Sequence, residues 1–269
     1  MRLRHALYLP PFGELADPAA MVELAVAAEE HGWDALFLWD HVLRPATEPA
    51  DIADVWVTLA AVAAATTTIR LGPMVTPVVR RRPHKLAREA VTLDHLSAGR
   101  LTLGLGLGVD NAGELSRFGE LVEVRARGDA LDEGAELLVS LWSGEEVHHR
   151  GTHFTADGVR FLPRPVQQPR IPLWFAARGD ARRPVRRAAR YDGLFPIEVD
   201  ADGLARMAEL VVAERGSLDG FDIAVLAVAG TDLDALAARG ATWAMRSFQP
   251  GETSADVLAA IESGPDAIG

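Results

Sequence analysis

The sequence predicts an α/β fold, namely a single (β/α)8 TIM barrel with an insertion before strand 5. Apolar, strand-like runs alternate with helical patterns along all 269 residues, and eight such pairs follow one another. Eight parallel strands, each followed by a helix, define this barrel, whose usual size is about 250 residues. No low-complexity linker interrupts the alternation, so we expect one domain spanning residues 1–269.

The barrel strands are expected where short apolar runs lie between turn-forming residues. These runs are residues 3–9, 35–39, 70–76, 101–108, 172–177, 193–197, 222–229 and 241–248. The helical patterns between them are residues 18–31, 54–66, 83–97, 117–142, 181–190, 201–215, 231–239 and 253–263. Asp17 followed by Pro18 predicts the first helix start, because aspartate accepts hydrogen bonds from free N–H groups and proline fits the first turn. Asp180 is expected to start a later helix.

Residues 83–108 show most clearly how a helix leads into a buried strand. Apolar residues recur at helical spacing until Gly99, which is placed to end the helix in a left-handed cap. The strand that follows is wholly apolar, as is typical of parallel sheets, and three glycines alternate with its leucines. Because glycine weakens a strand, we expect close barrel packing at Gly104 and Gly106 and a backbone approach to a ligand at Gly108.

An excursion at residues 143–171 departs from the alternation. It holds two short β-like pieces, Glu146–His149 and Thr152–Phe154, followed by a proline-rich segment. We expect a hairpin and loop inserted before the fifth strand and lying over one end of the barrel. Together with residues 42–53, which follow the second strand, this excursion is expected to shape the substrate pocket.

Composition limits the location and the chemistry of the chain. Hydrophobic residues make up 49% and charged residues 24%, which is typical of a globular protein, and no apolar run is long enough to span a bilayer. The first residues do not have the pattern of a secretory signal, so a cytoplasmic location is the default expectation. The net charge of −11 argues against nucleic-acid or anionic-membrane partners. The absence of cysteine excludes disulfides and thiolate catalysis.

The candidate catalytic residues follow the second expected strand, because active sites of such barrels lie at the carboxyl ends of the strands. His41 is the strongest candidate, since a neutral imidazole accepts or donates a proton near pH 7. The neighbouring carboxylate of Asp40 is a candidate to orient the ring, although adjacent strand residues point to opposite faces. A histidine that only ends a strand is the alternative.

The segment Ala177-Arg178-Gly179 precedes an expected helix, where free N–H groups and a guanidinium suit a phosphate. A plain strand-to-helix turn is the alternative at this position. Arginines also cluster at residues 80–82 and 182–190, where solvated surfaces are expected.

Other site classes lack their sequence signals. The histidines at 148, 149 and 153 have neither the spacing nor the carboxylate partner of a catalytic zinc site, so no metal is expected. Neither a G-x-S-x-G motif nor a phosphate-binding P-loop occurs, which disfavours hydrolase and nucleoside triphosphatase functions.

Three segments together resemble the bacterial luciferase-like monooxygenases and the related flavin- and deazaflavin-dependent oxidoreductases. They are GWDALFLWDH (32–41), IRLGPMVTPVVRRRPHKLAREAVTLDHLSAGRLTLGLGLG (69–108) and PLWFAARGDARRPVRRAARYDGLFP (172–196). The likeness runs from the first strand to Trp243. It implies a (β/α)8 barrel with an insertion before strand five, in agreement with the strand count, and an oxidoreductase acting on a small-molecule substrate.

The resemblance also implies how a cofactor ring would be held. His41, preceded by Asp40, would face the reactive ring. Met74 and Val75 fall where relatives have a non-proline cis peptide that bulges against the ring.

Two further segments would bind the tail of the cofactor. Gly108, Val109 and Asp110 fall in the loop that contacts the ribityl chain and phosphate, and Ala177, Arg178 and Gly179 match the second tail-binding loop. Val109 stands near the position where some sugar-phosphate dehydrogenases of the family have an acidic glutamate, so that activity is not expected.

The resemblance is compatible with two cofactors. Asp-His at the second strand end looks more like the branch that uses the deazaflavin coenzyme factor 420 (F420) than the Glu-His-His of light-emitting luciferases, so we expect hydride transfer to or from a small organic substrate. FMN with monooxygenation is the alternative. A non-catalytic barrel that binds flavin or a phosphate ligand is the alternative from another class. By analogy with the family, a homodimer is expected.

Overall fold

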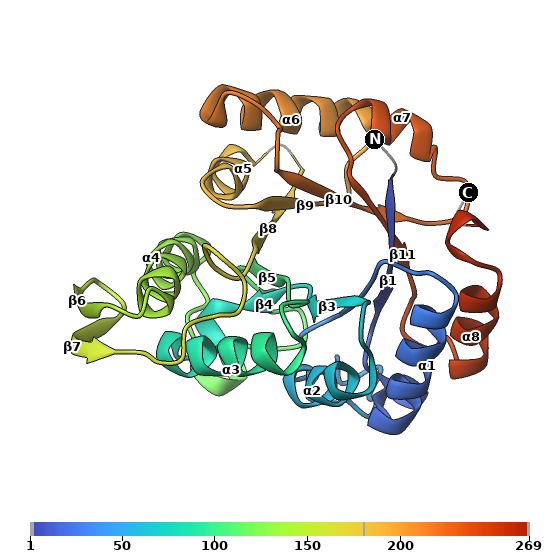
Figure 1. Cartoon of the computed structure of the whole chain (residues 1–269), viewed down its shortest axis with the longest axis horizontal. Coiled ribbons are helices and arrows are strands. Elements are labelled where there is room, and N and C mark those ends of the chain that lie inside the picture. The colour runs from blue at the N-terminus through green and yellow to red at the C-terminus, as the bar shows by residue number, and fades with distance from the viewer. Residues whose placement is uncertain (1–2, 180, 268–269) are drawn as a thin grey trace.

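The computed structural model describes residues 3–179 and 181–267, and in it a parallel β-barrel is enclosed by helices (Figure 1). The barrel strands are β1 (Arg4–Leu9), β2 (Ala35–Leu38), β3 (Arg70–Pro73), β4 (Thr76–Pro77), β5 (Leu103–Gly106), β8 (Leu173–Arg178), β9 (Gly193–Ile197), β10 (Asp222–Ala227) and β11 (Trp243–Ser247). They pair in the order β3-β2-β1-β11-β10-β9-β8-β5-β4.

The barrel closes because β3 and β4 are two halves of one strand. A cis peptide bond between Met74 and Val75 separates the halves. β4 pairs with β5, and a bridge between Leu71 and Leu101 joins β3 to the segment that precedes β5. The structure therefore confirms both the TIM barrel and the cis peptide that the resemblance implied.

The outer layer consists of α1 (Pro18–Glu30), α2 (Val55–Ala65), α3 (Pro83–Leu96), α4 (Val124–Trp142), α5 (Arg182–Ala189), α6 (Ala201–Arg215), α7 (Leu233–Ala238) and α8 (Ser254–Glu262). Four short 3-10 helices are η1 (Gly13–Ala16), η2 (Val78–Arg80), η3 (Ser116–Phe118) and η4 (Pro265–Ala267). In the part of the chain that the structure describes, no helix combines the length and the apolar character needed to cross a membrane.

Two predicted helix boundaries are confirmed by their hydrogen bonds and backbone angles. The Asp17 side chain accepts a hydrogen bond from the amide of Ala19 at 2.9 Å, and α1 begins at the proline between them. Gly99 follows the end of α3 with a φ of 85°, in the left-handed region that favours glycine. The predicted helix start at Asp180 lies outside the described residues.

Large aromatic side chains fill the centre of the barrel, and glycines on neighbouring strands make room for them. Phe37, Trp174 and Trp243 contact one another, with ring centroids 5.5 to 6.1 Å apart. A Cβ atom added to Gly193 would lie 2.4 Å from Trp174, and one added to Gly104 would lie 2.6 Å from the sulfur of Met74. These contacts are too short for a real side chain, so the packing explanation of Gly104 is confirmed.

The excursion forms a hairpin of β6 (Glu146–Arg150) and β7 (Thr155–Arg160) that projects beyond α4 (Figure 1). The second strand expected at Thr152–Phe154 was therefore placed too early. These residues form the turn instead, because the Glu133 carboxylate on α4 accepts hydrogen bonds from their backbone N–H groups. The proline-rich part is held by Asp94 of α3, which accepts from Val166 and Gln167. The excursion thus packs outside α3 and α4.

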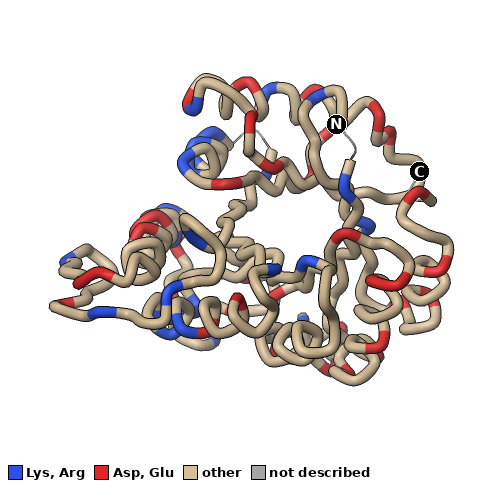
Figure 2. The backbone as a smooth tube through the Cα atoms, viewed as in Figure 1, with Lys and Arg blue, Asp and Glu red and all other residues tan. Residues whose placement is uncertain are grey.

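The arginines at residues 182–190 are exposed as expected, with the exception of Arg187. Arg187 is buried, and its Nε lies 2.5 Å from Asp132 of α4. Arg183 and Arg190 pair with the same carboxylate. An acidic helix therefore lies against a basic one, as Figure 2 shows for α4 and α5.

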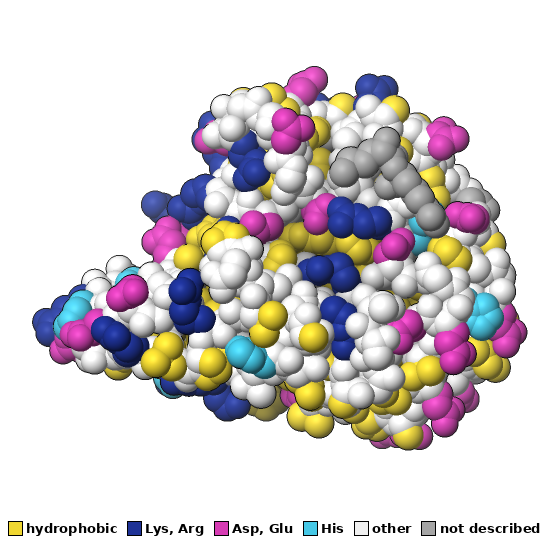
Figure 3. Space-filling model, in the orientation of Figure 1, with side chains coloured by type: hydrophobic (Ala, Val, Ile, Leu, Met, Phe, Trp, Pro, Cys, Tyr) yellow, Lys and Arg dark blue, Asp and Glu magenta, His cyan; other side chains and the backbone are white. Residues whose placement is uncertain are grey.

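The projecting hairpin carries mixed charges at its tip (Figure 3). His148 of β6 lies between Glu146 and Asp157, at 2.9 and 3.1 Å from their carboxylates. Among the described residues, no group of histidine and carboxylate side chains has the arrangement needed to hold a metal ion.

Candidate active site

The carboxyl ends of the barrel strands surround one cavity of about 500 Å³. Its apolar lining includes Tyr8, Trp39, Met74, Val75, Phe195, Ile197 and Leu226. Mostly apolar walls with a few polar groups are typical of small-molecule and cofactor sites, and this volume lies within their usual range. The excursion and residues 42–53 do not line the cavity, contrary to expectation.

His41 lies at the wall of this cavity and is oriented by Glu114. Nδ1 of His41 is 2.9 Å from Oε2 of Glu114. Because an ionised carboxylate only accepts hydrogen bonds, the imidazole donates through Nδ1. Its other nitrogen, Nε2, has no hydrogen-bond partner among the described residues, and the side chain is 30% exposed. The ring therefore presents Nε2 as the nitrogen available for proton transfer.

Glu114 is itself fixed from several directions. Its Oε1 accepts hydrogen bonds from the backbone N–H groups of Val42 at 2.7 Å and Leu43 at 3.1 Å. The guanidinium of Arg80 lies 3.4 Å from the same oxygen. The side chain of Glu114 is only 4% exposed, so these contacts replace the water that the carboxylate loses on burial.

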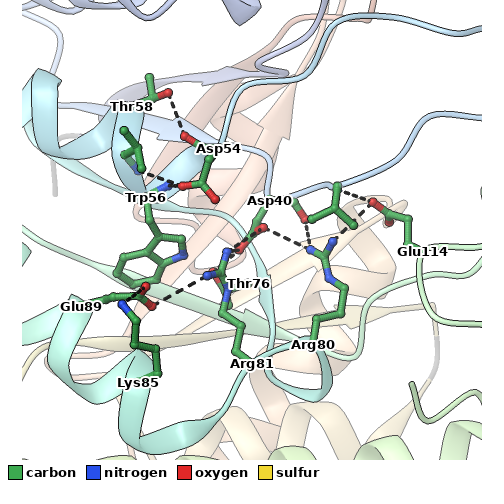
Figure 4. A network of polar contacts seen from close by, with 12 residues as sticks. Asp40, Asp54, Trp56, Thr58, Thr76, Arg80, Arg81, Lys85, Glu89 and Glu114 are labelled. Carbon is green, nitrogen blue, oxygen red and sulfur yellow. Dashed lines mark hydrogen bonds and ion pairs between the residues drawn. The ribbon is translucent and has the colours of Figure 1, made fainter. Parts of the chain in front are cut away.

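Asp40 does not contact His41. It binds Arg80, which in turn contacts Glu114. Figure 4 shows Arg80 between the carboxylates of Asp40 and Glu114. Asp40 also pairs with Arg81 at 2.9 Å and accepts a hydrogen bond from Thr76 at 2.7 Å. With its oxygens engaged in this way, Asp40 is placed to position Arg80 and not to exchange protons with a ligand.

The contacts of Glu114 explain why its pKa is low. Burial by itself raises the pKa of a carboxyl group. Here the hydrogen bond from His41, the charge of His41, the Val42 amide and the charge of Arg80 outweigh burial, so the pKa of Glu114 is held below its ordinary value. Glu114 is therefore a fixed negative charge beneath the imidazole.

The expectation that Arg80 and Arg81 are solvated is wrong, because the site uses both. Their side chains are 7% and 18% exposed, and both bind Asp40. Only Arg82 of this cluster is exposed to solvent. η2 follows β4 directly and brings Arg80 to the carboxylates of Asp40 and Glu114.

Six of the eight residues predicted to bind cofactor line the cavity. These are Met74, Val75, Gly108, Val109, Ala177 and Arg178. The other two, Asp110 and Gly179, do not line it. Gly179 borders a groove between α5 and α6.

Asp110, which was predicted to contact the cofactor tail, instead accepts hydrogen bonds within its own loop. Its Oδ1 accepts hydrogen bonds from the amides of Leu115 at 2.8 Å and Ser116 at 3.0 Å. These bonds close the loop that carries Glu114, so Asp110 supports the orientation of the catalytic candidate indirectly.

Gly108 is required by its own backbone and by its neighbour. Its φ is 72°, and an added Cβ atom would lie 2.9 Å from Cβ of Pro77. Packing therefore accounts for this glycine, and a close approach of a ligand to its backbone stays a prediction.

Glu114 and Arg80 are the residues that sequence reasoning missed. Glu114 lies in a loop without periodicity, several residues after the end of β5, where an acidic residue gives no signal of its own. Arg80 belongs to a run of three arginines, which usually indicates a solvated surface.

Besides Nε2 of His41, the polar groups of the cavity wall that have no partner in the described part of the chain include the indole Nε1 of Trp39 and the hydroxyl of Tyr8. Burial raises the pKa of Tyr8 well above its usual value, so the phenol remains a neutral donor. Buried donors normally have partners, and free donors between apolar walls fit a flat ring that carries carbonyl acceptors.

Fold and cavity together define a TIM-barrel protein with a cofactor-sized site at the carboxyl ends of its strands. The family model of the luciferase-like monooxygenases matches residues 4–264, and the chain belongs to this family.

Named relatives extend this result. The chain is 35% identical over 170 residues to an F420-dependent glucose-6-phosphate dehydrogenase of Nakamurella multipartita, covering 61% of this chain and 48% of the relative. It is 33% identical over 217 residues to the uncharacterized protein Rv0953c of Mycobacterium tuberculosis, covering 74% of each. The chain thus spans about half the length of the dehydrogenases that it matches.

Solved structures show the same fold at low sequence identity. An F420-dependent secondary alcohol dehydrogenase in complex with an F420-acetone adduct has a TM-score of 0.82 at 18% identity, covering 97% of this chain and 98% of that one. Monooxygenase RslO1 from Streptomyces bottropensis has a TM-score of 0.79 at 21% identity, covering 97% of both chains.

Proposed function

We propose that this protein is an oxidoreductase that uses F420 for hydride transfer to or from a small organic substrate. The observation that carries the proposal is His41, which lines the cavity with Nε2 free while Glu114 holds Nδ1. Membership of the luciferase-like family and the F420-dependent relatives support the choice of cofactor.

The residues of the cavity fit such a cofactor. Met74, Val75 and Ala176 offer an apolar surface, and Trp39 Nε1 offers a free donor beside it. Arg178 at the rim is the residue proposed to meet the phosphate of the tail, with Gly108 and Val109 beside it. When bound, F420 would supply the ring that accepts or donates hydride.

A side chain of the protein, His41, would transfer the proton that accompanies hydride transfer. Nε2 of His41 would take a proton from the substrate or return one, and the fixed charge of Glu114 would stabilise the protonated imidazole. Asp40 and Arg80 act as positioning residues in this proposal, because Arg80 contacts Glu114 and Asp40 holds Arg80. This assignment replaces the catalytic role expected for Asp40.

FMN with monooxygenation is the second candidate. It is supported by structural neighbours, including a 3,6-diketocamphane monooxygenase of Pseudomonas putida in complex with FMN, with a TM-score of 0.68 at 18% identity. The F420-dependent relatives are closer in sequence, which favours F420.

Parallel titrations with F420 and FMN, followed by fluorescence, test this proposal. We expect F420 to bind more tightly than FMN, with a Kd below about 100 μM, or roughly −5.5 kcal/mol. The His41→Ala variant should keep this affinity and lose hydride transfer. Weak binding of both cofactors would instead support a non-catalytic barrel.

A homodimer is part of the proposal. α2 is apolar on its outward side as well as its inward side, and Val57 on that outward side is 69% exposed. A helix that is apolar all round is normally buried, so a second copy of the chain would cover this surface.

A further inference from the structure

We propose that a crevice beside η2 is a second ligand site, which binds a small phosphate monoester with an apolar substituent. The crevice has a volume of about 220 Å³. It is lined by residues 79–82, by residues 120 and 121 of the loop before α4, by Ala130 of α4 and by residues 153 and 154 of the hairpin turn.

The crevice is separate from the cavity at the carboxyl ends of the strands. Among the described residues, none lines both. Its volume lies below the roughly 300–1,000 Å³ of most cofactor sites, so the ligand must be small. The proposal therefore goes beyond the proposed function and does not depend on it.

Three consecutive arginines line the crevice. Arg80 and Arg81 bind Asp40, and Arg80 also contacts Glu114. Those two carboxylates line the other cavity, so the crevice lies on the cationic side of these ion pairs. Arg82 is exposed and forms no hydrogen bond or ion pair with any described residue. Its guanidinium is thus free to hold a phosphate through two N–H donors.

His153 supplies a further donor from the turn of the hairpin. The Glu133 carboxylate accepts hydrogen bonds from the backbone N–H groups of His153 at 2.9 Å and Phe154 at 2.7 Å, which fixes this turn against α4. The imidazole of His153 has no hydrogen-bond partner in the described part of the chain. Since an imidazole donates through at least one nitrogen, His153 is able to bind a phosphate oxygen.

One carboxylate, that of Glu120, lines the crevice and would repel an anion. Its side chain forms no ion pair with the described residues. Glu89 and Glu133 do not line the crevice, and both are engaged elsewhere, Glu89 by Lys85 and Glu133 by the hairpin turn. Glu120 should therefore limit the affinity for an anion, and its replacement should raise that affinity.

The rest of the lining is apolar. Leu121 is 41% exposed, and Val79, Ala130 and Phe154 complete this wall. Exposed apolar surface favours a ligand that covers it. A phosphate monoester carries close to two negative charges near pH 7 and three acceptor oxygens, which suits Arg82 together with His153. Its substituent would cover Leu121, whereas inorganic phosphate would use the donors alone.

The test compares phenyl phosphate, inorganic phosphate and benzoate by ¹H–¹⁵N NMR titration of the protein in a phosphate-free buffer. We expect phenyl phosphate to bind with a Kd of about 1 mM or below and to shift the signals of Arg82, Leu121 and His153. Inorganic phosphate and benzoate should each bind about tenfold more weakly. Equal affinity for either of them, or no binding of phenyl phosphate at 20-fold this concentration, roughly 20 mM, overturns the proposal.

Variants that change one charge assign the binding to the crevice. Arg82→Gln should weaken the binding of phenyl phosphate about tenfold. Arg160→Gln is the matched control, at an exposed arginine of β7 that has no ion pair in the described chain, and should have no effect. Glu120→Gln should strengthen binding about threefold, which a loss of structure would not do. Equal effects of the two arginine variants, or weaker binding by Glu120→Gln, contradict the site.

Two more variants separate the parts of the ligand and the two cavities. Leu121→Asn should weaken the binding of phenyl phosphate and leave that of inorganic phosphate unchanged. Arg178→Gln, at the other cavity, should change neither. If Arg178→Gln removes the binding, phenyl phosphate occupies the proposed cofactor site and the inference fails.

Discussion

The carboxylate of Glu114 lies 2.9 Å from Nδ1 of His41, although the two residues are 73 positions apart in the chain. The histidine follows β2, whereas the glutamate lies in the loop after β5. Their contact engages Nδ1 and leaves Nε2 as the free imidazole nitrogen. It also connects His41 through Arg80 to Asp40.

Replacing the carboxylate of Glu114 should impair proton transfer more than binding. We expect Glu114→Gln to lower kcat by about 10²-fold, within the range of general acid–base catalysis, with little change in the Kd for F420. ¹⁵N NMR of the histidine side chains should show His41 protonated at Nδ1 in the native protein and as a mixture of tautomers in Glu114→Leu. An unchanged tautomer in Glu114→Leu would show that Glu114 does not orient the ring.

Removing Arg80 should destabilise the fold. Arg80 compensates two buried carboxylates, so Arg80→Met is expected to cost about 3 kcal/mol of unfolding free energy. The matched control is Arg82→Met at the exposed neighbouring arginine, which should change stability by about 0.5 kcal/mol or less. Urea denaturation measures both, and equal effects would contradict a special role for Arg80.

Stability at acidic pH should depend on Glu29 of α1. Burial by itself raises the pKa of this carboxyl, but hydrogen bonds from the amides of Ile69, Thr68 and Thr67 and from the Thr68 hydroxyl lower it to about 2. A carboxyl whose pKa is lower in the folded than in the unfolded chain stabilises the fold above the unfolded pKa, and this contribution is lost as the pH falls through the folded value.

The stability difference between the native protein and Glu29→Gln should therefore be full at pH 7. It should decrease from about pH 4.5 and vanish near pH 2. Thermal unfolding across this range measures it, and a difference that does not vary with pH would be inconsistent with the lowered pKa.

Two glycines of β5 should respond differently to alanine. At Gly104 an added Cβ meets the carbonyl oxygen of Pro73 at 2.6 Å, so Gly104→Ala should cost about 1–3 kcal/mol of stability. At Gly106 it meets a methyl group of Val75 at 2.5 Å, and a side chain can rotate away more easily than a backbone.

Gly106→Ala is thus expected to destabilise the fold less than Gly104→Ala. It should weaken F420 binding, since Val75 lines the cavity. Thermal unfolding and fluorescence titration of both variants test the difference. The reverse order of stabilities would show that the Val75 side chain cannot move.

A charge on the outward side of α2 should separate the proposed dimer. Val57→Lys is expected to convert the protein to a monomer, as measured by light scattering after gel filtration. Val124→Lys, at another exposed valine, is the control and should remain a dimer. A native protein that is monomeric at all concentrations would refute the homodimer.

Much of the fold followed from the sequence because it depends on local patterns. Apolar runs and helical spacing predicted the barrel, and Asp17 and Gly99 predicted helix ends through hydrogen bonds and backbone angles that involve only nearby residues. His41 and six of the residues predicted to bind cofactor line one cavity, because the carboxyl ends of parallel strands must meet at one end of a barrel.

The errors concern side chains whose surroundings come from distant segments. Arg80 and Arg187 belong to arginine-rich runs that resemble solvated surface, yet each is buried against carboxylates from other elements. Asp110 follows a strand end as a ligand-binding residue would, but its loop folds back and uses the carboxylate. The excursion could not be placed because only its contacts with Glu133 and Asp94 decide its position.

The sequence by itself determined the barrel, the order of its strands and the location of the cavity, since these follow from periodicity and strand direction. Only the tertiary structure decided which carboxylate accepts the hydrogen bond from His41. Asp40 is adjacent in sequence but points to the other side of the strand end, where Arg80 and Arg81 bind it. Glu114 reaches the imidazole because closure of the barrel brings the loop after β5 to the end of β2, a proximity that local spacing does not encode.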